Sequence, residues 1–144
     1  MIYKKSWKYI LIKDNYLYRI KSLKDFKDIR KGDLGGYIGD YNNLSQTGDC
    51  WIYDIAKVSR EARVSGNAVV KDEAQVYGNA RVFGNAVVSE QSNVFGNAQV
   101  FENAQVYGLA KVYERAVISG NARIFGSAWI HGRAQVSGFT NINK

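Results

Sequence analysis

The sequence predicts an all-β fold, a three-sided parallel β-helix of about five coils, and three observations support this prediction. Residues 48–143 divide into sixteen consecutive blocks of six residues, without an insertion or a deletion. The third residue of each block is small, being Ala in thirteen blocks and Cys50, Ser92 or Thr140 in the others. The fifth residue is Val or Ile in all sixteen. Such a strict short repeat is typical of a solenoid.

Each block is interpreted as a short strand followed by a corner. Positions three to five form the strand, so the small and the β-branched side chains point inward and position four points outward. Positions six, one and two turn the chain, and they often carry Gly at position one and Asn at position two, which both tolerate positive φ. Three blocks then close one triangular coil, and neighbouring coils stack at ~4.8 Å.

The blocks resemble those of left-handed β-helix hexapeptide-repeat proteins, in which an aliphatic residue is followed four places later by a small one. This pattern is met by Val76 with Ala80, Val82 with Ala86, and Val100 with Ala104. In that family Gly usually follows the aliphatic residue directly, whereas here Tyr, Phe or Ser mostly stands there and Gly comes one place later. The resemblance implies a left-handed coil.

Residues 1–47 are predicted to be a basic N-terminal cap, and residues 48–144 the β-helix, because a solenoid exposes apolar core and strand edges at its ends. The first segment holds ten Lys and Arg against five Asp, whereas the second holds ten against eight Asp and Glu. The overall charge of +7 permits attraction to an acidic partner, and the alternative that the basic N-terminal segment binds nucleic acid stays open.

Within the cap, strands are expected at 7–12 and 16–21, joined by a hairpin turn at Asp14-Asn15. A short helical piece is expected near 22–28. The pairs Lys31-Gly32 and Gly35-Gly36 are interpreted as two further turns.

A second resemblance covers most of the chain. The stretches YRIKSLKDF (18–26), GDLGGYI (32–38) and NLSQTGDCWIYD (43–54) are similar to those of short phage and prophage proteins of the hexapeptide-repeat or polymer-forming-like kind. Those proteins have no established activity. The chain itself is expected to be a non-enzymatic binding or scaffold protein, and the resemblance implies that it acts in the host cytoplasm on a host protein, such as a defence component to be inhibited, or on an anionic nucleotide.

Few residues suggest catalysis or a cofactor. One cysteine, Cys50, excludes an internal disulfide, suits a reducing cytoplasm, and stands at an inward packing position. One histidine, His131, cannot supply the three histidine ligands of a γ-type carbonic anhydrase zinc site, so no metal and no cofactor are predicted. Acidic residues at block position one, such as Glu90, are interpreted as solvated charges. The apolar run at 9–12 is too short for a signal peptide or a membrane span.

The alternative from another class is an acyltransferase that uses His131 as its base, since many left-handed β-helices are acyltransferases. No loop interrupts the coils between residues 48 and 143, and an acyl donor needs a groove that binds its polar groups. No catalytic residue is therefore predicted.

Two sets of residues are predicted to form contacts between subunits. Trp51, Val69 and Val87 recur at the same position of successive coils and form an apolar run, which either the N-terminal hairpin or a second subunit should cover. Phe139 and Ile142 lie in the last coil, where no capping helix is evident. A homo-oligomer is therefore expected, either a trimer through the first set or an end-to-end dimer through the second.

A partner- or ligand-binding strip is predicted from further columns of residues that recur from coil to coil. Tyr77, Phe95 and Tyr113 form one aromatic column, for which a self-packing ladder is the alternative. Arg63 and Arg81 stand on neighbouring coils, and Phe83 is close to them. Such an arginine pair could hold a phosphate or an acidic side chain.

Overall fold

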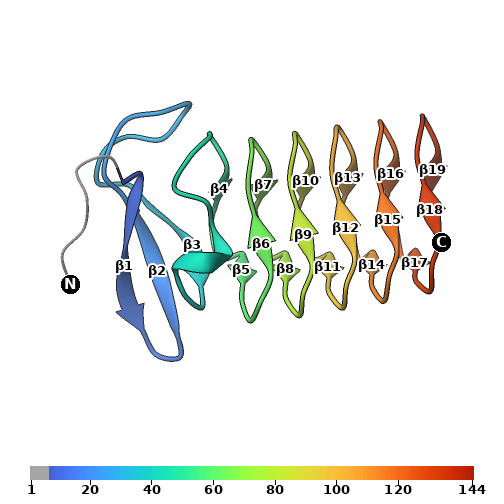
Figure 1. Cartoon of the computed structure of the whole chain (residues 1–144), viewed down its shortest axis with the longest axis horizontal. Coiled ribbons are helices and arrows are strands. Elements are labelled where there is room, and N and C mark those ends of the chain that lie inside the picture. Colours follow the sequence, from blue (N-terminus) through green and yellow to red (C-terminus); the bar gives the residue numbers. More distant parts are fainter. Residues whose placement is uncertain (1–6) are drawn as a thin grey trace.

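The computed structural model describes residues 7–144 and shows a prism of stacked coils with a β-hairpin at its N-terminal end (Figure 1). The eight-stranded sheet contains, in spatial order, β1 (Tyr9–Asp14), β2 (Leu17–Ser22), β3 (Leu34–Ile38), β5 (Lys57–Val58), β8 (Gln75–Val76), β11 (Asn93–Val94), β14 (Lys111–Val112) and β17 (Trp129–Ile130). The six-stranded sheet contains β4 (Trp51–Ile52), β7 (Val69–Val70), β10 (Val87–Val88), β13 (Gln105–Val106), β16 (Arg123–Ile124) and β19 (Asn141–Ile142). The five-stranded sheet contains β6 (Arg63–Val64), β9 (Arg81–Val82), β12 (Gln99–Val100), β15 (Val117–Ile118) and β18 (Gln135–Val136).

The predicted three-sided parallel β-helix is confirmed, with about six turns rather than five, because β3 adds a turn before the first regular block. In the regular coils each strand pairs in parallel with the equivalent strand of the next coil, as Arg81 does with Gln99. The backbone N–H of Arg81 donates to the carbonyl of Ala98 at 2.9 Å, and the other coils repeat this bond. The left hand of the coil stays a prediction from the family resemblance.

The core consists of the two inward columns that the block predicts. Val82, Val100 and Ile124 at position five are fully buried, as is Ala98 at position three. Ser92 replaces Ala at position three, and its hydroxyl donates to the carbonyl of Ser89 at 2.7 Å, so this buried polar group is satisfied. The inward and outward assignment of the sequence is therefore confirmed.

The corners explain the acidic residues at position one. Asp54, Asp72, Glu90, Glu102 and Glu114 all have φ between 56° and 60°, a conformation that favours Gly. Each of their carboxylates accepts the backbone N–H of the equivalent residue in the next coil, for example Glu90 Oε1 from Gly108 at 2.8 Å. These carboxylates lie on exposed corners, in agreement with the interpretation as solvated charges, and in addition they bind one coil to the next.

The N-terminal segment differs from its prediction in two places. β1 and β2 form the expected antiparallel hairpin, with Asn15 at φ 61° in the turn. Residues 22–28 contain no helix, and the 3-10 turn η1 (Tyr41–Asn43) is the only helical element in residues 7–144. Gly35 and Gly36 lie inside β3 instead of forming a turn. A Cβ on Gly36 would come within 2.5 Å of Ile52 Cγ2 and 2.6 Å of the Ala56 carbonyl, so Gly is required here for close packing.

The solenoid begins at β3, before the boundary at residue 48 that the sequence indicated. Tyr37 pairs with Lys57 and Leu44 with Val64, so the chain takes a longer path around this first turn than around a regular coil. The additional length lies before Trp51, which pairs with Val69 in the regular register. Gln46 lies in this longer turn. Its amide oxygen accepts the backbone N–H of Lys8 at 2.6 Å, and its amide nitrogen donates to the carbonyl of Tyr9 at 3.1 Å.

Trp51 is covered by the N-terminal segment, which removes it from the predicted subunit interface. Its exposed fraction is 0%, and its ring meets those of Phe26 and Tyr9 edge-on at centroid distances of 5.3 and 6.3 Å. Val69 and Val87 are half-buried beside this cover. The sequence left the N-terminal hairpin or a second subunit as the cover of this apolar run, and the structure shows the N-terminal segment over Trp51.

The last coil leaves its strand edges open. β17, β18 and β19 each stand at the end of their sheet order. Phe139 is 84% exposed, whereas Ile142 is half-buried and packs against the core. Both residues are thus placed where the sequence analysis expected them, at an end that no helix among the described residues covers.

Candidate functional site

Four arginines line the outer surface of the five-stranded sheet, which we call the arginine face. Arg63 and Arg81 stand at position four of their blocks, in β6 and β9, and their side chains are exposed. Arg115 and Arg133 stand at position two, before β15 and β18, and are also exposed. Arg63 and Arg81 point outward from strands, whereas Arg115 and Arg133 are turn residues in the corner that leads into β15 and β18. The arginine face thus comprises the outer surface of the five-stranded sheet and this adjoining corner.

The arginines carry charges that the chain does not neutralise. Arg63 and Arg81 are direct register partners on neighbouring strands, where like charges are unfavourable. Within residues 7–144 the only ion pair is between His131 and Glu114, so no carboxylate neutralises an arginine of this face. Such a surface attracts an external anion.

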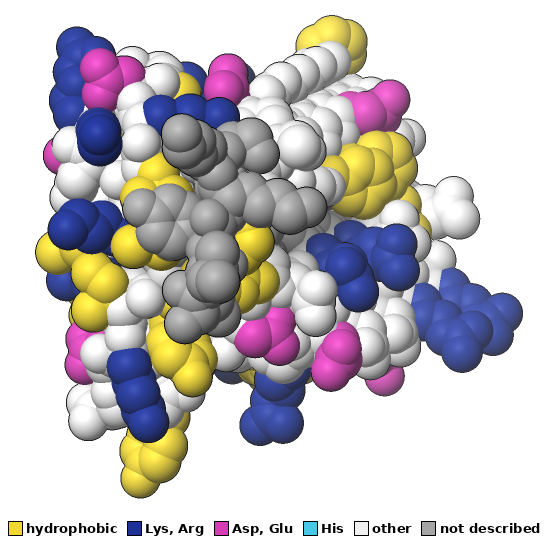
Figure 2. Space-filling model, turned by 60° about the vertical axis from the view of Figure 1, so that its left-hand side comes forward, with side chains coloured by type: hydrophobic (Ala, Val, Ile, Leu, Met, Phe, Trp, Pro, Cys, Tyr) yellow, Lys and Arg dark blue, Asp and Glu magenta, His cyan; other side chains and the backbone are white. Residues whose placement is uncertain are grey.

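The other two faces of the solenoid are less basic. The arginine face carries its four arginines against Glu61, a net charge of +3. By the same positions, Lys57 and Lys111 oppose Glu73 on the eight-stranded side, and Lys71 and Arg123 oppose Asp49 on the six-stranded side, a net +1 each. By this count the net positive charge of the repeat is highest on one of its three sides. Figure 2 shows one face of the molecule, on which Lys and Arg side chains lie on both the left and the right.

The predicted binding strip is divided between two faces. Phe83 shares the arginine face with Arg63 and Arg81, and it stacks on Phe101 with centroids 4.8 Å apart and an interplanar angle of 2°. Tyr77, Phe95 and Tyr113 stack in the same manner on the eight-stranded sheet, at 4.9 and 5.0 Å. In both columns neighbouring rings stack face to face. Within a column this stacking occupies the ring faces between neighbours, so a base or a sugar could stack only on the outer face of an end ring.

Arg115 and Arg133 are not among the predicted binding residues, because the binding strip was derived from positions four and six of the blocks alone. The signal was present: the two residues occupy the same position of neighbouring coils, two places before an outward residue. Listing position two in the same register would have added them to Arg63 and Arg81.

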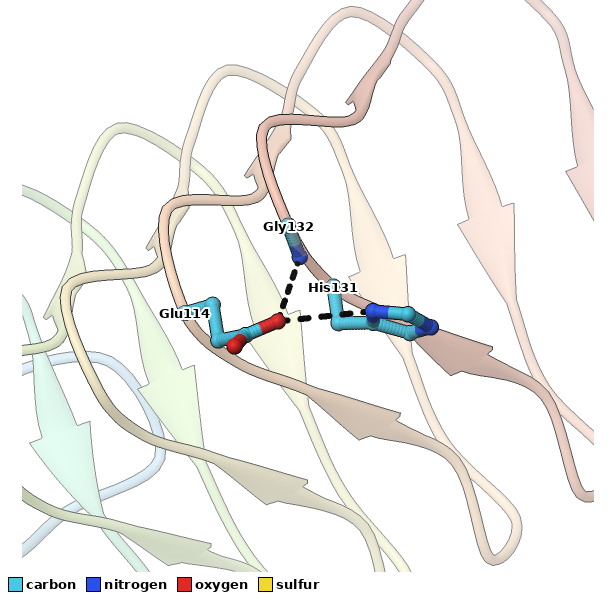
Figure 3. A network of polar contacts seen from close by, with 3 residues as sticks. All are labelled: Glu114, His131 and Gly132. Carbon is cyan, nitrogen blue, oxygen red and sulfur yellow. Dashed lines mark hydrogen bonds and ion pairs between the residues drawn. The ribbon is translucent and has the colours of Figure 1, made fainter.

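His131 forms a small polar network at one corner (Figure 3). Its Nδ1 lies 3.4 Å from Glu114 Oε1, which also accepts the backbone N–H of Gly132 at 2.8 Å. The imidazole stacks on Tyr113 at 5.2 Å, as the last ring of that aromatic column. Both side chains are more than half exposed, so this pair lies on an open surface.

The cavities of the described chain are shallow surface depressions. One of about 410 Å³ lies between the hairpin tip and the first coils, around Tyr37 and Ile55. Another of about 330 Å³ lies at the corner beside Arg115 and Arg133. In residues 7–144 no group of three or more His, Cys, Asp or Glu side chains is arranged to hold a metal ion. That part of the chain also contains no helix long and apolar enough to cross a membrane.

Cys50 is a packing residue, as expected, and it has a buried partner. Lys8 Nζ donates to the Cys50 carbonyl at 2.7 Å and lies 3.4 Å from Cys50 Sγ. Burial lowers the pKa of the Lys8 ammonium and raises the pKa of the Cys50 thiol. The thiol therefore stays protonated and enclosed, which does not suit a nucleophile.

Comparisons with known proteins agree with the fold. The model of the YdcK beta solenoid repeat matches residues 74–90 and 110–132. A protein of Escherichia coli (strain K12) named "Uncharacterized acetyltransferase YdcK" is 38% identical over 66 residues, which cover 40% of this chain. The matched part spans a fifth (20%) of that relative's length. Both matches agree with the β-solenoid fold that the coordinates show.

Proposed function

We propose that this chain is a non-enzymatic binding module that presents a rigid, flat surface to an anionic partner. The observation that carries the proposal is the arginine face, where four exposed arginines have no carboxylate partner. Coils with identical backbone bonds hold the Cα atoms of these arginines at fixed spacings, so only the side chains must be ordered on binding. A host protein with an acidic surface and a phosphate-bearing molecule both belong to this class of partner.

Acyl transfer is the second candidate function. It is favoured by the contact between His131 and Glu114, which leaves Nε2 of the imidazole free to act as a base, and by the name of the Escherichia coli relative. However, Glu90 and Glu102 accept the N–H groups of Gly108 and Gly120 in the same way, and no histidine stands beside them. The position of Glu114 is therefore explained by its corner, and no deep groove adjoins His131.

Two measurements on the wild type and His131→Ala separate these functions. We expect both proteins to bind immobilised heparin and labelled polyglutamate equally well at about 50 mM salt, since the anion is held by arginine. We expect neither to release free thiol from acetyl-CoA in the presence of amines and sugars. Turnover that disappears in His131→Ala would establish the second candidate. Failure to bind either polyanion would refute the proposed function.

Self-association is a further part of the proposal. An end-to-end dimer through Phe139 and Ile142 would pair the open edges of the last coil, and a trimer would use the half-buried Val69 and Val87. Light scattering should therefore give a multiple of the 16.2 kDa chain mass. Phe139→Glu with Ile142→Glu should dissociate the dimer, and Val69→Glu with Val87→Glu the trimer. A monomer at micromolar concentration would contradict both.

A further inference from the structure

We infer that the arginine face binds the phosphate backbone of a single-stranded nucleic acid, or a linear phosphate polymer of the same chemistry, laid along the solenoid axis. The inference rests on the proposed function, because it names the anionic partner and the surface that holds it. It differs from the alternative in which the basic N-terminal segment binds nucleic acid.

The spacing of the arginines suits a chain of phosphates. Arg63 and Arg81 are one coil apart, and so are Arg115 and Arg133, because each pair occupies one block position in neighbouring coils. The two pairs are centred three coils apart along the axis, or ~14 Å at the ordinary strand spacing. With phosphates ~3.4 Å apart along a strand, this distance corresponds to about four nucleotides. The guanidinium fork matches the oxygens of a phosphate, whereas an ammonium acts only as a point charge.

The surroundings of the arginines favour contacts to phosphate over contacts to bases. Phe83 and Phe101 stack on each other, so this column offers at most its two outer ring faces and not a series of platforms for successive single-stranded bases. The amides of Asn79, Asn97 and Gln99 continue the columns of the arginines and are exposed donors. Binding should therefore depend on the backbone charge and hardly on base sequence.

Other anionic occupants fit the face less well. An acidic protein surface would need an apolar anchor at the centre of the interface, yet the large hydrophobic side chains exposed in the described chain all lie elsewhere. A small anionic ligand would need an enclosing pocket, whereas the depression beside Arg115 and Arg133 is open and includes Glu114. A polymer needs neither feature, since several weak contacts act together.

The test measures how binding of fluorescein-labelled oligo(dT) of about 20 nucleotides depends on salt between roughly 50 and 200 mM. If four phosphates are neutralised, the slope of log K against log salt should be about −2.8 for a single strand. Arg63→Gln with Arg81→Gln should reduce the slope to about −1.4 and weaken binding roughly 25-fold at about 100 mM salt. The matched control is Lys57→Gln with Lys71→Gln, which removes the same charge from the other two faces. The control should keep the slope of the wild type.

Three outcomes would overturn the inference. Equal losses in the arginine variant and the lysine control would mean that the whole basic surface attracts the oligonucleotide. Competition by polyglutamate as effective per charge as competition by polyphosphate would assign the face to acidic proteins. Binding of neither oligo(dT) nor polyphosphate at about 50 mM salt would refute the inference, and the proposed function would still stand if polyglutamate or heparin bound. Stronger competition by polyphosphate than by unlabelled oligo(dT) would support phosphate as the group that is bound, and it would identify polyphosphate as the polymer that the face prefers.

Discussion

The N-terminal strands β1, β2 and β3 continue one of the three sheets of the regular coils, but different kinds of contact hold the two regions in place. In the coils each block repeats the same inward pair and the same backbone bonds to the next coil. In the N-terminal segment single side chains make the connecting contacts. The Trp51 ring packs against the rings of Phe26 and Tyr9, and the side-chain amide of Gln46 donates to the carbonyl of Tyr9. Stability in the coils is therefore distributed over many equal contacts, whereas in the N-terminal segment it is concentrated in a few residues.

The largest effect is expected from removing the covered tryptophan. Trp51→Ala should lower the free energy of unfolding by about 3–5 kcal/mol, because a large side chain with no exposed surface is lost from the joint between cap and coils. The matched control is Trp129→Ala, at the same block position but 59% exposed, which should change the free energy far less. Chemical denaturation of both variants measures the difference. Equal losses would show that the N-terminal cover does not hold Trp51.

The close approach at β3 should produce the next largest effect. Gly36→Ala should destabilise the protein by about 3 kcal/mol, because backbone atoms such as the Ala56 carbonyl cannot rotate away from the new Cβ. Gly132 has φ +65° with nothing within 4 Å of an added Cβ, so Gly132→Ala should show only the strain of the left-handed backbone, about 1 kcal/mol. Thermal unfolding of the two variants tests this order. If Gly36→Ala proved the milder change, Gly36 would not be required for packing.

Overpacking within a regular coil should have a moderate effect. Ala98→Leu adds volume to a fully buried column and should cost about 1–3 kcal/mol, since neighbouring coils leave no space for it. Gln99→Leu places the same side chain outward on the next residue, and it should fold normally. Circular dichroism during denaturation measures both variants. Equal destabilisation by the two substitutions would contradict the alternation of inward and outward positions.

The smallest effect should come from one corner carboxylate. Glu90→Ala removes the acceptor for the N–H of Gly108, which should cost about 0.5–1.5 kcal/mol on an exposed corner. Glu90→Gln retains an acceptor oxygen and should recover most of this loss. Glu73→Ala on the neighbouring corner position provides a further comparison, because Glu73 accepts only from the Gln91 side chain at 3.1 Å. A loss at Glu73 as large as that at Glu90 would indicate a general charge effect.

The two regions also differ in how well sequence predicted them. The inward and outward positions of the coils followed from the block alone, since every coil presents the same environment at the same position. Gly35-Gly36 was misinterpreted because a glycine pair signals a turn locally, whereas its cause here is the distant contact with Ile52 and Ala56. The first turn was not predicted because its longer path departs from the regular spacing of the repeat. Side chains also supply part of its hydrogen bonding: Asn43 accepts from the backbone N–H of Gly39 and donates to the carbonyl of Ala62. Arg115 and Arg133 could have been predicted.

The most direct test of the central claim is to locate bound anion by NMR of the arginine Nε–H groups while oligo(dT) is added. We expect the signals of Arg63, Arg81, Arg115 and Arg133 to shift together. Arg123 on the six-stranded sheet and Arg19 and Arg30 in the N-terminal segment should stay unchanged, because they lie outside the arginine face. Shifts confined to Arg19 and Arg30 would place binding on the N-terminal segment and contradict the account.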